Sequence, residues 1–215
     1  MIKIERTSVM NFENAIRGAR NPMNSWGRMD SSYDADGNYV LGANDLDLAR
    51  RLAHAGSDHR KFLRQIFVSA DITAPLYWWK EFDTYKVGTV ANSCSTMHKI
   101  HAKAFTRDDF SCDRLDEGGL AALDALIVYL EGERQKFVAD KENRQPWHNM
   151  IQLLPSSYNQ MRTVSMNYEN LINMYYARRF HKLAEWHTYC DWIRSLPYAG
   201  ELICIKDSDE GGKAE

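Results

Sequence analysis

The sequence predicts an α+β fold in which mostly helices surround a small mixed sheet, and three observations carry this prediction. Several segments place apolar residues at the helical intervals of three and four. One segment alternates apolar and polar residues as a half-buried strand does, and a second is compatible with a strand. With 215 residues, of which 44% are apolar, the chain is long enough to enclose a hydrophobic core without disulfides or metals.

The chain contains neither an internal repeat nor a low-complexity linker. We therefore expect a single domain over residues 1–205. The remaining residues, 206–215 (KDSDEGGKAE), are polar and contain glycine, which predicts a flexible tail.

The first predicted elements precede residue 83. Turn-forming residues over 21–42, clearest in SYDADGNY, predict a long loop or an irregular hairpin. Asn44 or Asp45 can then cap a short helix. Residues 65–72 (QIFVSADI) alternate apolar and polar side chains, which predicts a half-buried strand. Pro75 is well placed to open the helix that follows, because proline suits the first helical turn.

The longest helical pattern covers residues 119–140, with leucines and an isoleucine on one face. A second helix is expected to begin near Pro146 and to end before Pro155. Residues 160–166 are compatible with a strand. These elements extend the predicted mixture of helices and strands into the second half of the chain.

Asn167 can cap the next helix, whose inner face contains Leu171, Met174, Tyr175 and Arg178. A further helix is expected to end before Pro197. Arg178 is the unusual member of the apolar stripe, because a buried unpaired charge is costly. Its guanidinium therefore needs a partner, which is either an internal ion pair or a ligand.

Charge and hydropathy exclude several classes of protein. The 27 basic and 29 acidic residues give a net charge of −2, which argues against a protein that coats nucleic acid. No apolar run approaches the length of about 18 residues that a membrane span requires. The first 25 residues lack the apolar region of a secretory signal. We therefore expect a cytoplasmic protein with neither a nucleic-acid nor a membrane partner.

The cysteines and histidines do not predict a metal site. Cys94, Cys112, Cys190 and Cys204 are too far apart in sequence to form a CxxC pair, so we expect reduced thiols. None of the seven histidines forms the helical zinc-protease motif. The glycine-rich phosphate-loop and dinucleotide motifs are also missing from the sequence.

Two stretches combine aromatic and polar residues. Residues 74–98 place the run LYWW beside charged residues and then a series of Ser, Thr and Asn. They predict either the wall of a ligand site or a buried aromatic helix followed by a polar loop. Asn167, Asn170 and Asn173 recur every three residues and so share one helical face. Their amides suit the edge of a nucleobase or an isoalloxazine, or else serve as a helix cap and solvated side chains.

These stretches resemble the flavin-dependent thymidylate synthases, the ThyX-type family, over about residues 58–203. The family signature is R-H-R-x-x-S-x-N-E-x-S-x-R, and here the corresponding segment reads TYKVGTVANSCSTM. Thr84, Tyr85 and Lys86 stand at R-H-R and Thr89 at the first serine, and after one inserted residue Asn92, Ser93, Ser95 and Met97 stand at N, E, S and the last R. Of the signature positions at which the family has arginine, only that of Lys86 has a cation in this chain.

A second part of the resemblance lies downstream. The family has Leu-Pro, an Asn twelve residues after the proline and an Arg eleven residues further on. This chain matches both spacings with Pro155, Asn167 and Arg178. Upstream, His59 falls at a family histidine and Glu81 at a family glutamine, while Ile151 replaces a family arginine.

The resemblance implies an enzyme that methylates dUMP at C5. Members of the family are homotetramers that bind FAD and dUMP between subunits. They take the one-carbon unit from methylenetetrahydrofolate and use NADPH to reduce the flavin, without a cysteine nucleophile. The protein's task is to orient the cofactor and to stabilise charge that develops on the uracil.

The resemblance also implies the site residues. Arg178 is the expected catalytic residue, because it corresponds to the family arginine and lies on the inward stripe. The expected cofactor-binding residues are His59, Lys86, Asn92, Asn167 and Asn173, and the expected substrate-binding residues are Glu81, Ser93, Ser95 and Arg178. Lys86 and Ser95 would meet the nucleotide phosphate.

Two alternatives follow from the replaced signature arginines and glutamate. The chain could be a related enzyme that modifies another pyrimidine nucleotide at C5. It could also retain the fold as a non-catalytic protein that binds a nucleotide or flavin or supports an assembly. Stabilisation by dUMP without NADPH oxidation would favour the non-catalytic alternative.

Overall fold

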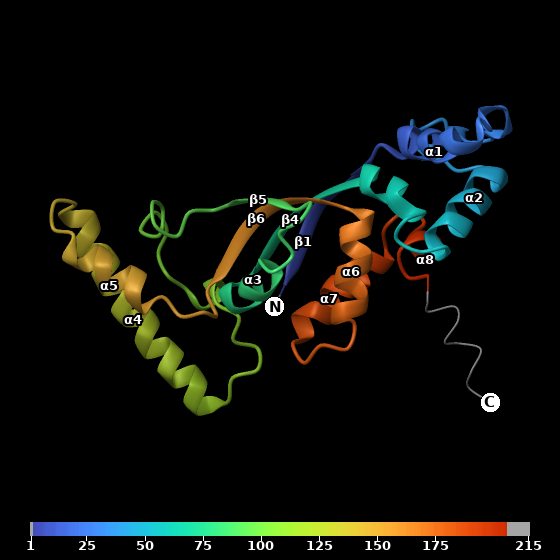
Figure 1. Cartoon of the computed structure of the whole chain (residues 1–215). Coiled ribbons are helices and arrows are strands. Elements are labelled where there is room, and N and C mark those ends of the chain that lie inside the picture. Colours follow the sequence, from blue (N-terminus) through green and yellow to red (C-terminus); the bar gives the residue numbers. More distant parts are fainter. Residues whose placement is uncertain (1, 206–215) are drawn as a thin grey trace, which may run out of the picture. The chain divides into compact units, whose positions relative to one another are not determined.

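A computed structural model describes residues 2–205 of the chain (Figure 1). In chain order its elements are β1 (Lys3–Met10), α1 (Phe12–Arg20), η1 (Asn21–Met23), η2 (Trp26–Arg28), β2 (Ser32–Tyr33), β3 (Tyr39–Val40), α2 (Ala43–His54), η3 (Arg60–Gln65), β4 (Phe67–Pro75), α3 (Leu76–Phe82), β5 (Val90–Ser93), η4 (Arg107–Asp109), α4 (Glu117–Ala139), α5 (Gln145–Leu153), β6 (Asn159–Asn167), α6 (Tyr168–Arg178), α7 (Ala184–Arg194) and α8 (Ala199–Leu202). The predicted α+β class is confirmed. The tail expected over residues 206–215 lies outside the described residues.

The principal sheet has four strands in the order β1-β4-β6-β5. It is antiparallel, whereas the sequence predicted a mixed sheet. Along β4 the side chains of Val68, Ala70, Ile72 and Ala74 are buried, and those between them are more exposed. This alternation is the one that the sequence predicted. β2 and β3 form a separate antiparallel hairpin in which Tyr33 pairs with Tyr39.

The described chain divides into two compact units. The first contains residues 2–5, 71–84 and 91–163, and the second contains residues 6–70, 85–90 and 164–205. The chain passes from one unit to the other within β1, β4, β5 and β6, and between residues 84 and 85. The single domain that we expect over residues 1–205 stays a prediction.

The first unit has its own hydrophobic core, formed where α4 and α5 pack together. Its buried members are Ile100, Phe105, Phe110, Leu123, Leu130, Phe137 and Met150. Glu131 of α4 ties residue 105 to this helix by accepting the Phe105 N–H at 3.1 Å. Bonds from Arg134, opposed in part by burial, lower the pKa of Glu131 to about 2, so the carboxylate is charged throughout the neutral range.

The aromatic run on α3 is also buried. Trp78, Trp79 and Phe82 are each at most 2% exposed. Trp79 donates its indole N–H to the Gln160 carbonyl at 2.9 Å. Of the two interpretations of this run, the buried aromatic helix is therefore correct, and these side chains do not form the wall of a ligand site.

The second unit is helical around η3 and α6. α1, α2 and α6 all pack on η3, and α7 packs on α6. Its core includes the buried rings of Tyr168, Tyr175, Trp186 and Tyr189. Tyr189 donates its hydroxyl to the sulfur atoms of Met166 and Met174, at 3.2 and 3.3 Å. Burial raises the pKa of this phenol well above its ordinary value, so it stays neutral.

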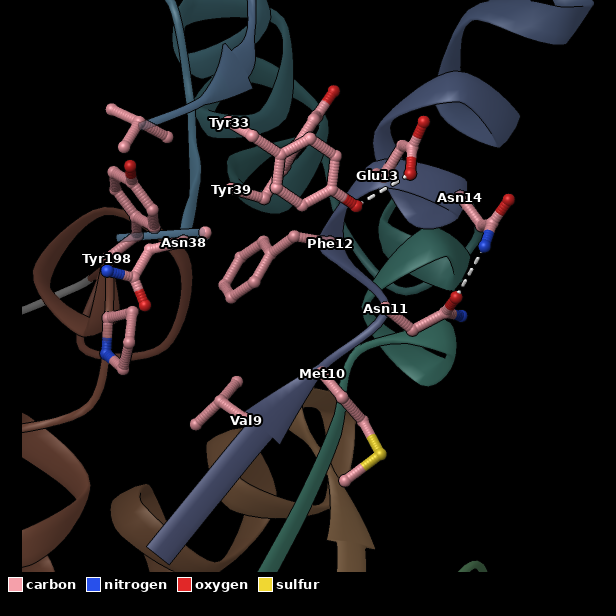
Figure 2. A pocket seen from close by; sticks show the side chains of 13 residues that line it. Val9, Met10, Asn11, Phe12, Glu13, Asn14, Tyr33, Asn38, Tyr39 and Tyr198 are labelled. Atoms are coloured by element: carbon pink, nitrogen blue, oxygen red, sulfur yellow. Dashed lines mark hydrogen bonds between the residues drawn. The ribbon is translucent and has the colours of Figure 1, made fainter. Parts of the chain in front are cut away.

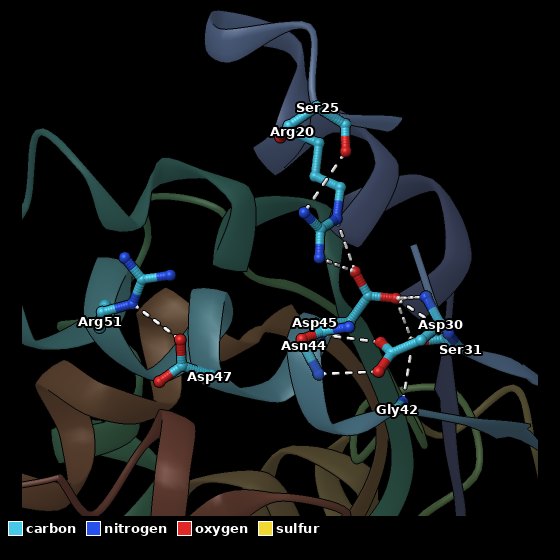
Figure 3. A network of polar contacts seen from close by, with 9 residues as sticks. All are labelled: Arg20, Ser25, Asp30, Ser31, Gly42, Asn44, Asp45, Asp47 and Arg51. Atoms are coloured by element: carbon cyan, nitrogen blue, oxygen red, sulfur yellow. Dashed lines mark hydrogen bonds and ion pairs between the residues drawn. The ribbon is translucent and has the colours of Figure 1, made fainter. Parts of the chain in front are cut away.

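A buried ion pair joins α1 to α2 (Figure 3). Arg20 lies 2.6 Å from the Asp45 carboxylate, and the two side chains are 4% and 0% exposed. The other oxygen of Asp45 accepts the Ser31 hydroxyl and the Asp30 N–H. This set of bonds satisfies a charge that would otherwise be costly to bury.

The same region corrects the expected start of α2. The helix begins at Ala43, and neither Asn44 nor Asp45 caps it. Instead the carboxylate of Asp30 accepts the N–H groups of both residues, at 2.8 and 3.0 Å. The cap therefore comes from another part of the chain. Gly42 allows this approach, because a Cβ there would lie 2.3 Å from the Asp30 carboxyl carbon.

The other predicted helices agree with the structure within a few residues. Pro75 precedes α3, α4 is the longest helix described, and α5 and α7 end before Pro155 and Pro197. Asn167 caps α6 as expected, through a reciprocal capping box with Asn170. Among the α-helices and strands of the described chain, β1, α1, β5 and α8 were not predicted, and neither were the short helices η1 to η4.

No helix within residues 2–205 is both long and apolar enough to cross a membrane. In the same residues, no three metal-ligating side chains lie close enough together to hold a metal ion.

The four cysteines are free thiols in different environments. Cys94 is exposed, Cys112 is half-buried, and Cys190 and Cys204 are buried. Burial raises the pKa of the Cys190 thiol to about 12, which leaves very little reactive thiolate at neutral pH.

We expect iodoacetamide to modify Cys94 first in the native protein. Cys190 should react only after denaturation, because both its accessibility and its thiolate fraction are low. Peptide mass spectrometry after timed labelling measures both rates. A Cys94→Ser variant is the control and should lose the fast phase. Rapid native labelling of Cys190 would contradict this assignment.

Candidate functional site

Arg178, the last residue of α6, lies half-buried in the second unit. Its Nε donates a hydrogen bond to the Tyr85 hydroxyl at 2.9 Å. The guanidinium carbon also lies 4.9 Å from the ring centre of buried Trp186. A cation at this distance over an aromatic face is stabilised by the ring quadrupole. The side chain is thus held in one place, directly against the segment that carries the signature.

The segment 85–89, which we name the Tyr85 loop, packs on the first turn of α6. Asn170 donates its side-chain amide to the Val87 carbonyl at 2.7 Å. Gly88 has a φ of 78°, in the left-handed region that favours glycine. A Cβ at Gly88 would lie 3.0 Å from the Asn170 oxygen and 3.3 Å from the Asn167 nitrogen. Glycine therefore permits the loop to contact both amides.

The amide face of α6 has a structural role in part. Asn167 accepts the Asn170 N–H at 3.0 Å and Asn170 accepts the Asn167 N–H at 3.1 Å. These bonds cap the helix, as one of the two interpretations of the amides predicted. Asn173 is exposed one turn further along, and Lys86 is exposed on the Tyr85 loop. No ion pair joins Lys86 to a carboxylate of the described residues.

Replacing Gly88 with alanine is expected to displace the Tyr85 loop, since the new Cβ is strained at this φ and too close to Asn170. On the expectation from the resemblance that the chain binds dUMP, we expect at least a several-fold loss of that affinity, with a smaller effect on global stability. Titration calorimetry with dUMP and thermal unfolding measure the two effects. Gly132→Ala is the control, because a Cβ there meets nothing within 4 Å. Unchanged affinity in the Gly88 variant would contradict the role of this loop.

His59 lies elsewhere in the second unit, where it precedes η3 and is exposed. It lines a pocket of about 650 Å³ whose walls include Leu48, Leu52 and Phe62. Lys61 and Arg64 also line this pocket. No carboxylate of residues 2–205 forms an ion pair with either cation. The pocket therefore combines apolar walls with two cations and one carboxylate, that of Asp58.

The other expected site residues lie in the first unit. Glu81 is half-buried near the end of α3, and Asn92 and Ser93 are exposed on β5. Ser95 follows β5, and its hydroxyl accepts the His98 N–H at 3.0 Å. The structure thus groups Arg178, Asn167, Asn173 and Lys86 on α6, its N-cap and the Tyr85 loop, and the other four on α3, on β5 and just after β5.

Arg162 is engaged within the first unit. Its guanidinium donates to Asp83 at 2.8 Å and to Gln160 at 3.0 Å, and it lies 4.2 Å from the ring centre of Trp79. These contacts occupy two of its five N–H donors and hold the guanidinium over Trp79. The charge of Arg162 is therefore paired with a carboxylate of its own unit.

The structure adds four residues that the sequence analysis did not assign to a site. Two lie beside Arg178 and two lie at the pocket that contains His59. Tyr85 and Trp186 hold Arg178, and Lys61 and Arg64 flank the pocket that contains His59. The available signals were weak. Tyr85 occupies a signature position where the family has histidine, and Lys61 and Arg64 follow His59 closely in sequence.

Comparison with known proteins places the fold. No protein-family model matches the sequence. No curated protein matches it either. Solved structures, in contrast, match along nearly the whole chain, and three of them are described next.

Thymidylate synthase X from Helicobacter pylori, solved with FAD and dUMP, has a TM-score of 0.67 and 16% identity over 94% of this chain and 97% of its own. A second structure of that flavin-dependent enzyme with FAD and dUMP has a TM-score of 0.63 and 17% identity, with the same coverage. The UMP/dUMP methylase PolB from Streptomyces cacaoi, bound to 5-Br dUMP, has a TM-score of 0.63 and 12% identity over 95% of both chains.

The chain therefore has the fold of the flavin-dependent thymidylate synthases. The resemblance inferred from the signature and its spacings is confirmed at the level of the fold. The low identities fit a divergent sequence on this fold.

Proposed function

We propose that this protein is a flavin-dependent enzyme that modifies a pyrimidine nucleotide at uracil C5, with dUMP as the expected substrate. The observation that supports this most directly is the position of Arg178. The residue that matches the family arginine is half-buried and bonded to Tyr85 of the signature segment, 93 positions away in sequence. The finer proposal is methylation of dUMP with methylenetetrahydrofolate, FAD and NADPH.

Arg178 suits the role of stabilising charge on the uracil. When uracil reacts at C5, negative charge develops on one of its oxygen atoms, and a guanidinium at that edge of the ring stabilises this charge. Tyr85 and Trp186 hold the group in place before the nucleotide arrives. Little reorganisation is then needed during the reaction, which is where such groups have their largest effect.

Lys86 and Ser95 are assigned to the nucleotide phosphate. Lys86 is exposed and has no ion-pair partner among the described residues, so its ammonium is available to an anion. Glu81 and Ser93 are assigned to the remaining polar groups of the substrate. A lysine binds phosphate as a point charge rather than bidentately, so we expect binding that depends on ionic strength.

The residues present fit a flavin. The pocket beside His59 has apolar walls of about the size that a ring system requires, and Lys61 and Arg64 offer charge to a diphosphate. Asn92, Asn167 and Asn173 are assigned to the same cofactor. Bound FAD would supply the redox chemistry of the one-carbon transfer, while the protein provides position and charge.

The assembly and location are proposals of the same kind. The sites would be completed in a homotetramer, and the protein would act in the cytoplasm on small-molecule substrates. Val87 is 89% exposed on the Tyr85 loop and Val90 is 67% exposed beside it. Exposed valines at a candidate site are consistent with a surface that a subunit or a ligand covers.

The purified protein provides the test. Oxidised flavin gives a yellow colour and characteristic visible bands, so absorbance before and after addition of FAD measures binding. Substrate-dependent NADPH oxidation and loss of deuterium from C5-labelled dUMP then measure turnover. A colourless protein that takes up no FAD would overturn the proposal, while complementation of a thymidine-requiring strain would support methylation of dUMP.

A second candidate is a non-catalytic nucleotide-binding or assembly protein. It is favoured by Thr84, Met97 and Ile151, which stand where the family has arginine. Thermal unfolding separates the two candidates, because a ligand that binds the native state raises the unfolding temperature. Stabilisation by dUMP with neither NADPH oxidation nor deuterium loss would select this second function.

A further inference from the structure

A second pocket lies in the same unit as Arg178, between the start of α1, the β2-β3 hairpin and the residues before α8 (Figure 2). Its volume is about 760 Å³. We name it the aromatic pocket, because its lining includes Phe12, Tyr33, Tyr39 and Tyr198. Nothing in the proposed reaction uses these residues.

The rings of the aromatic pocket stand at steep angles to one another. Tyr33 and Tyr39 have centroids 5.1 Å apart and planes inclined by 63°. Phe12 and Tyr198 have centroids 5.5 Å apart and planes inclined by 71°. Walls at such angles can present both ring faces and ring edges to one enclosed group, as the boxes that enclose alkylated ammonium ions do.

The charge of the lining is negative. Glu13 contributes a carboxylate, and no lysine, arginine or histidine is among the lining residues. Tyr33 donates its hydroxyl to one oxygen of this carboxylate at 2.8 Å, as Figure 2 shows. No hydrogen bond from the described residues reaches the other oxygen, which is available to a ligand. A phenol that donates to a carboxylate also has a more electron-rich ring, which strengthens its attraction for a cation.

The walls are held in place without a ligand. Tyr198 accepts the Leu41 N–H at 2.9 Å, which ties its ring to the end of the hairpin. Asp34 accepts the N–H groups of Asp36 and Asn38 and so closes the turn between Tyr33 and Tyr39. A preformed site loses less conformational entropy when it binds.

We propose that the aromatic pocket binds an organic cation with an alkylated ammonium group. The rings supply cation–π attraction and Glu13 supplies the opposite charge. FAD and dUMP are polyanions, which this lining disfavours, so the proposal concerns a ligand other than those of the proposed enzyme. It stands independently of that function.

An alkylated ammonium group has two sources, a free quaternary ammonium compound and a methylated lysine side chain. Choline and a short peptide with trimethyllysine represent them. The pocket volume of about 760 Å³ exceeds that of an alkylated ammonium group, so it leaves room for the chain attached to either one.

Titration calorimetry of the full-length protein with choline provides the first test. The matched ligand is 3,3-dimethylbutanol, which has the shape of choline without its charge. We expect choline to bind about tenfold more tightly than this neutral ligand, as the loss of a cation–π and carboxylate attraction implies. Equal affinities, or no binding of choline, would overturn the proposal.

Two variants locate the binding site. Glu13→Gln keeps an acceptor for the Tyr33 hydroxyl but removes the charge, and we expect it to weaken choline binding several-fold. Tyr33→Leu removes a ring that is 58% exposed, so the fold should survive. Tyr129→Leu is the control, because Tyr129 is 44% exposed in the other unit. If both pocket variants bound choline like the wild type, the assigned site would be wrong.

The trimethyllysine peptide separates the two sources. Tighter binding of the peptide than of choline supports a methylated protein as the partner, and the reverse order supports a free ammonium compound. If Tyr33→Leu fails to fold by circular dichroism, the comparison of choline with 3,3-dimethylbutanol on the wild-type protein still decides the proposal. Flavin absorbance on the same samples reports separately on the proposed enzyme.

Discussion

Arg178→Ala is expected to lower the turnover of dUMP by about 100- to 1000-fold, the usual effect of removing one group that stabilises developing charge. This expectation rests on the proposed function. The fold should largely survive, because Arg178 is half-buried at the end of α6 rather than enclosed in the core. Steady-state kcat/KM and thermal unfolding measure the two effects.

Two further variants sharpen this test. Arg178→Lys keeps the charge but loses the planar fork that contacts Tyr85 and lies over Trp186, so we expect only partial recovery of activity. Arg179→Ala removes the neighbouring cation, which lies over Tyr176 and Phe180, and should retain most of the activity. Turnover like that of the wild type in Arg178→Ala would refute its role. Unfolding of that variant would instead show that Arg178 is chiefly structural.

Asp45→Ala is expected to destabilise the protein by about 3–5 kcal/mol, because it leaves the Arg20 guanidinium buried without its counter-ion. Arg20 is only 4% exposed, so water cannot replace the lost carboxylate. The loop that contains Ser31 also loses its bonds to Asp45. Chemical denaturation followed by circular dichroism measures the free energy of unfolding.

Asp47→Ala is the matched control on the same helix, and Figure 3 shows both pairs. Asp47 pairs with Arg51 four residues later, but the two side chains are 62% and 67% exposed. Exposed pairs contribute less than about 1 kcal/mol. Similar losses in the two variants would contradict the importance that we assign to burial.

The same pair predicts a dependence on pH. Burial raises the pKa of Asp45, but the bonds from Ser31 and Arg20 lower it more, so the net pKa is below the ordinary value of 3.8. A carboxyl group with a lowered folded pKa stabilises the protein above its unfolded pKa. That stability is lost as the pH falls through 3.8 towards the folded value. We therefore expect Asp45→Asn to unfold with a weaker dependence on acid than the wild type.

Most helices could be predicted because their signals are local. Asn167 and Asn170 form a capping box three residues apart, and Pro75, Pro155 and Pro197 mark helix ends through their own restricted backbone. Residues of α1 carry similar apolar spacing, but no strong cap or proline marks its start, and Asn11 enters it with a φ of 74°. β5 was missed because its side chains are all exposed and give no alternation.

The residues of the candidate sites also divide into those that the sequence could identify and those that it could not. Arg178 could be chosen because its spacing to Asn167 and Pro155 matches the family pattern and because it falls on the apolar stripe of its helix. Its partner Tyr85 could not be identified as such, because no local rule joins residues 93 positions apart. The aromatic pocket was missed for that reason as well, since its rings come from three distant segments.

By itself, the sequence determined the α+β class and the ends of most helices, and its resemblance to the family singled out the arginine that we assign to the proposed chemistry. Only the tertiary structure decided that Asp30 caps α2, that Arg20 is buried against Asp45, and which aromatic rings meet around Glu13. The physical reason is the range of the interactions. Propensity, caps and periodicity act within a few residues, whereas buried charge pairs and pockets exist only after chain closure has brought distant residues together.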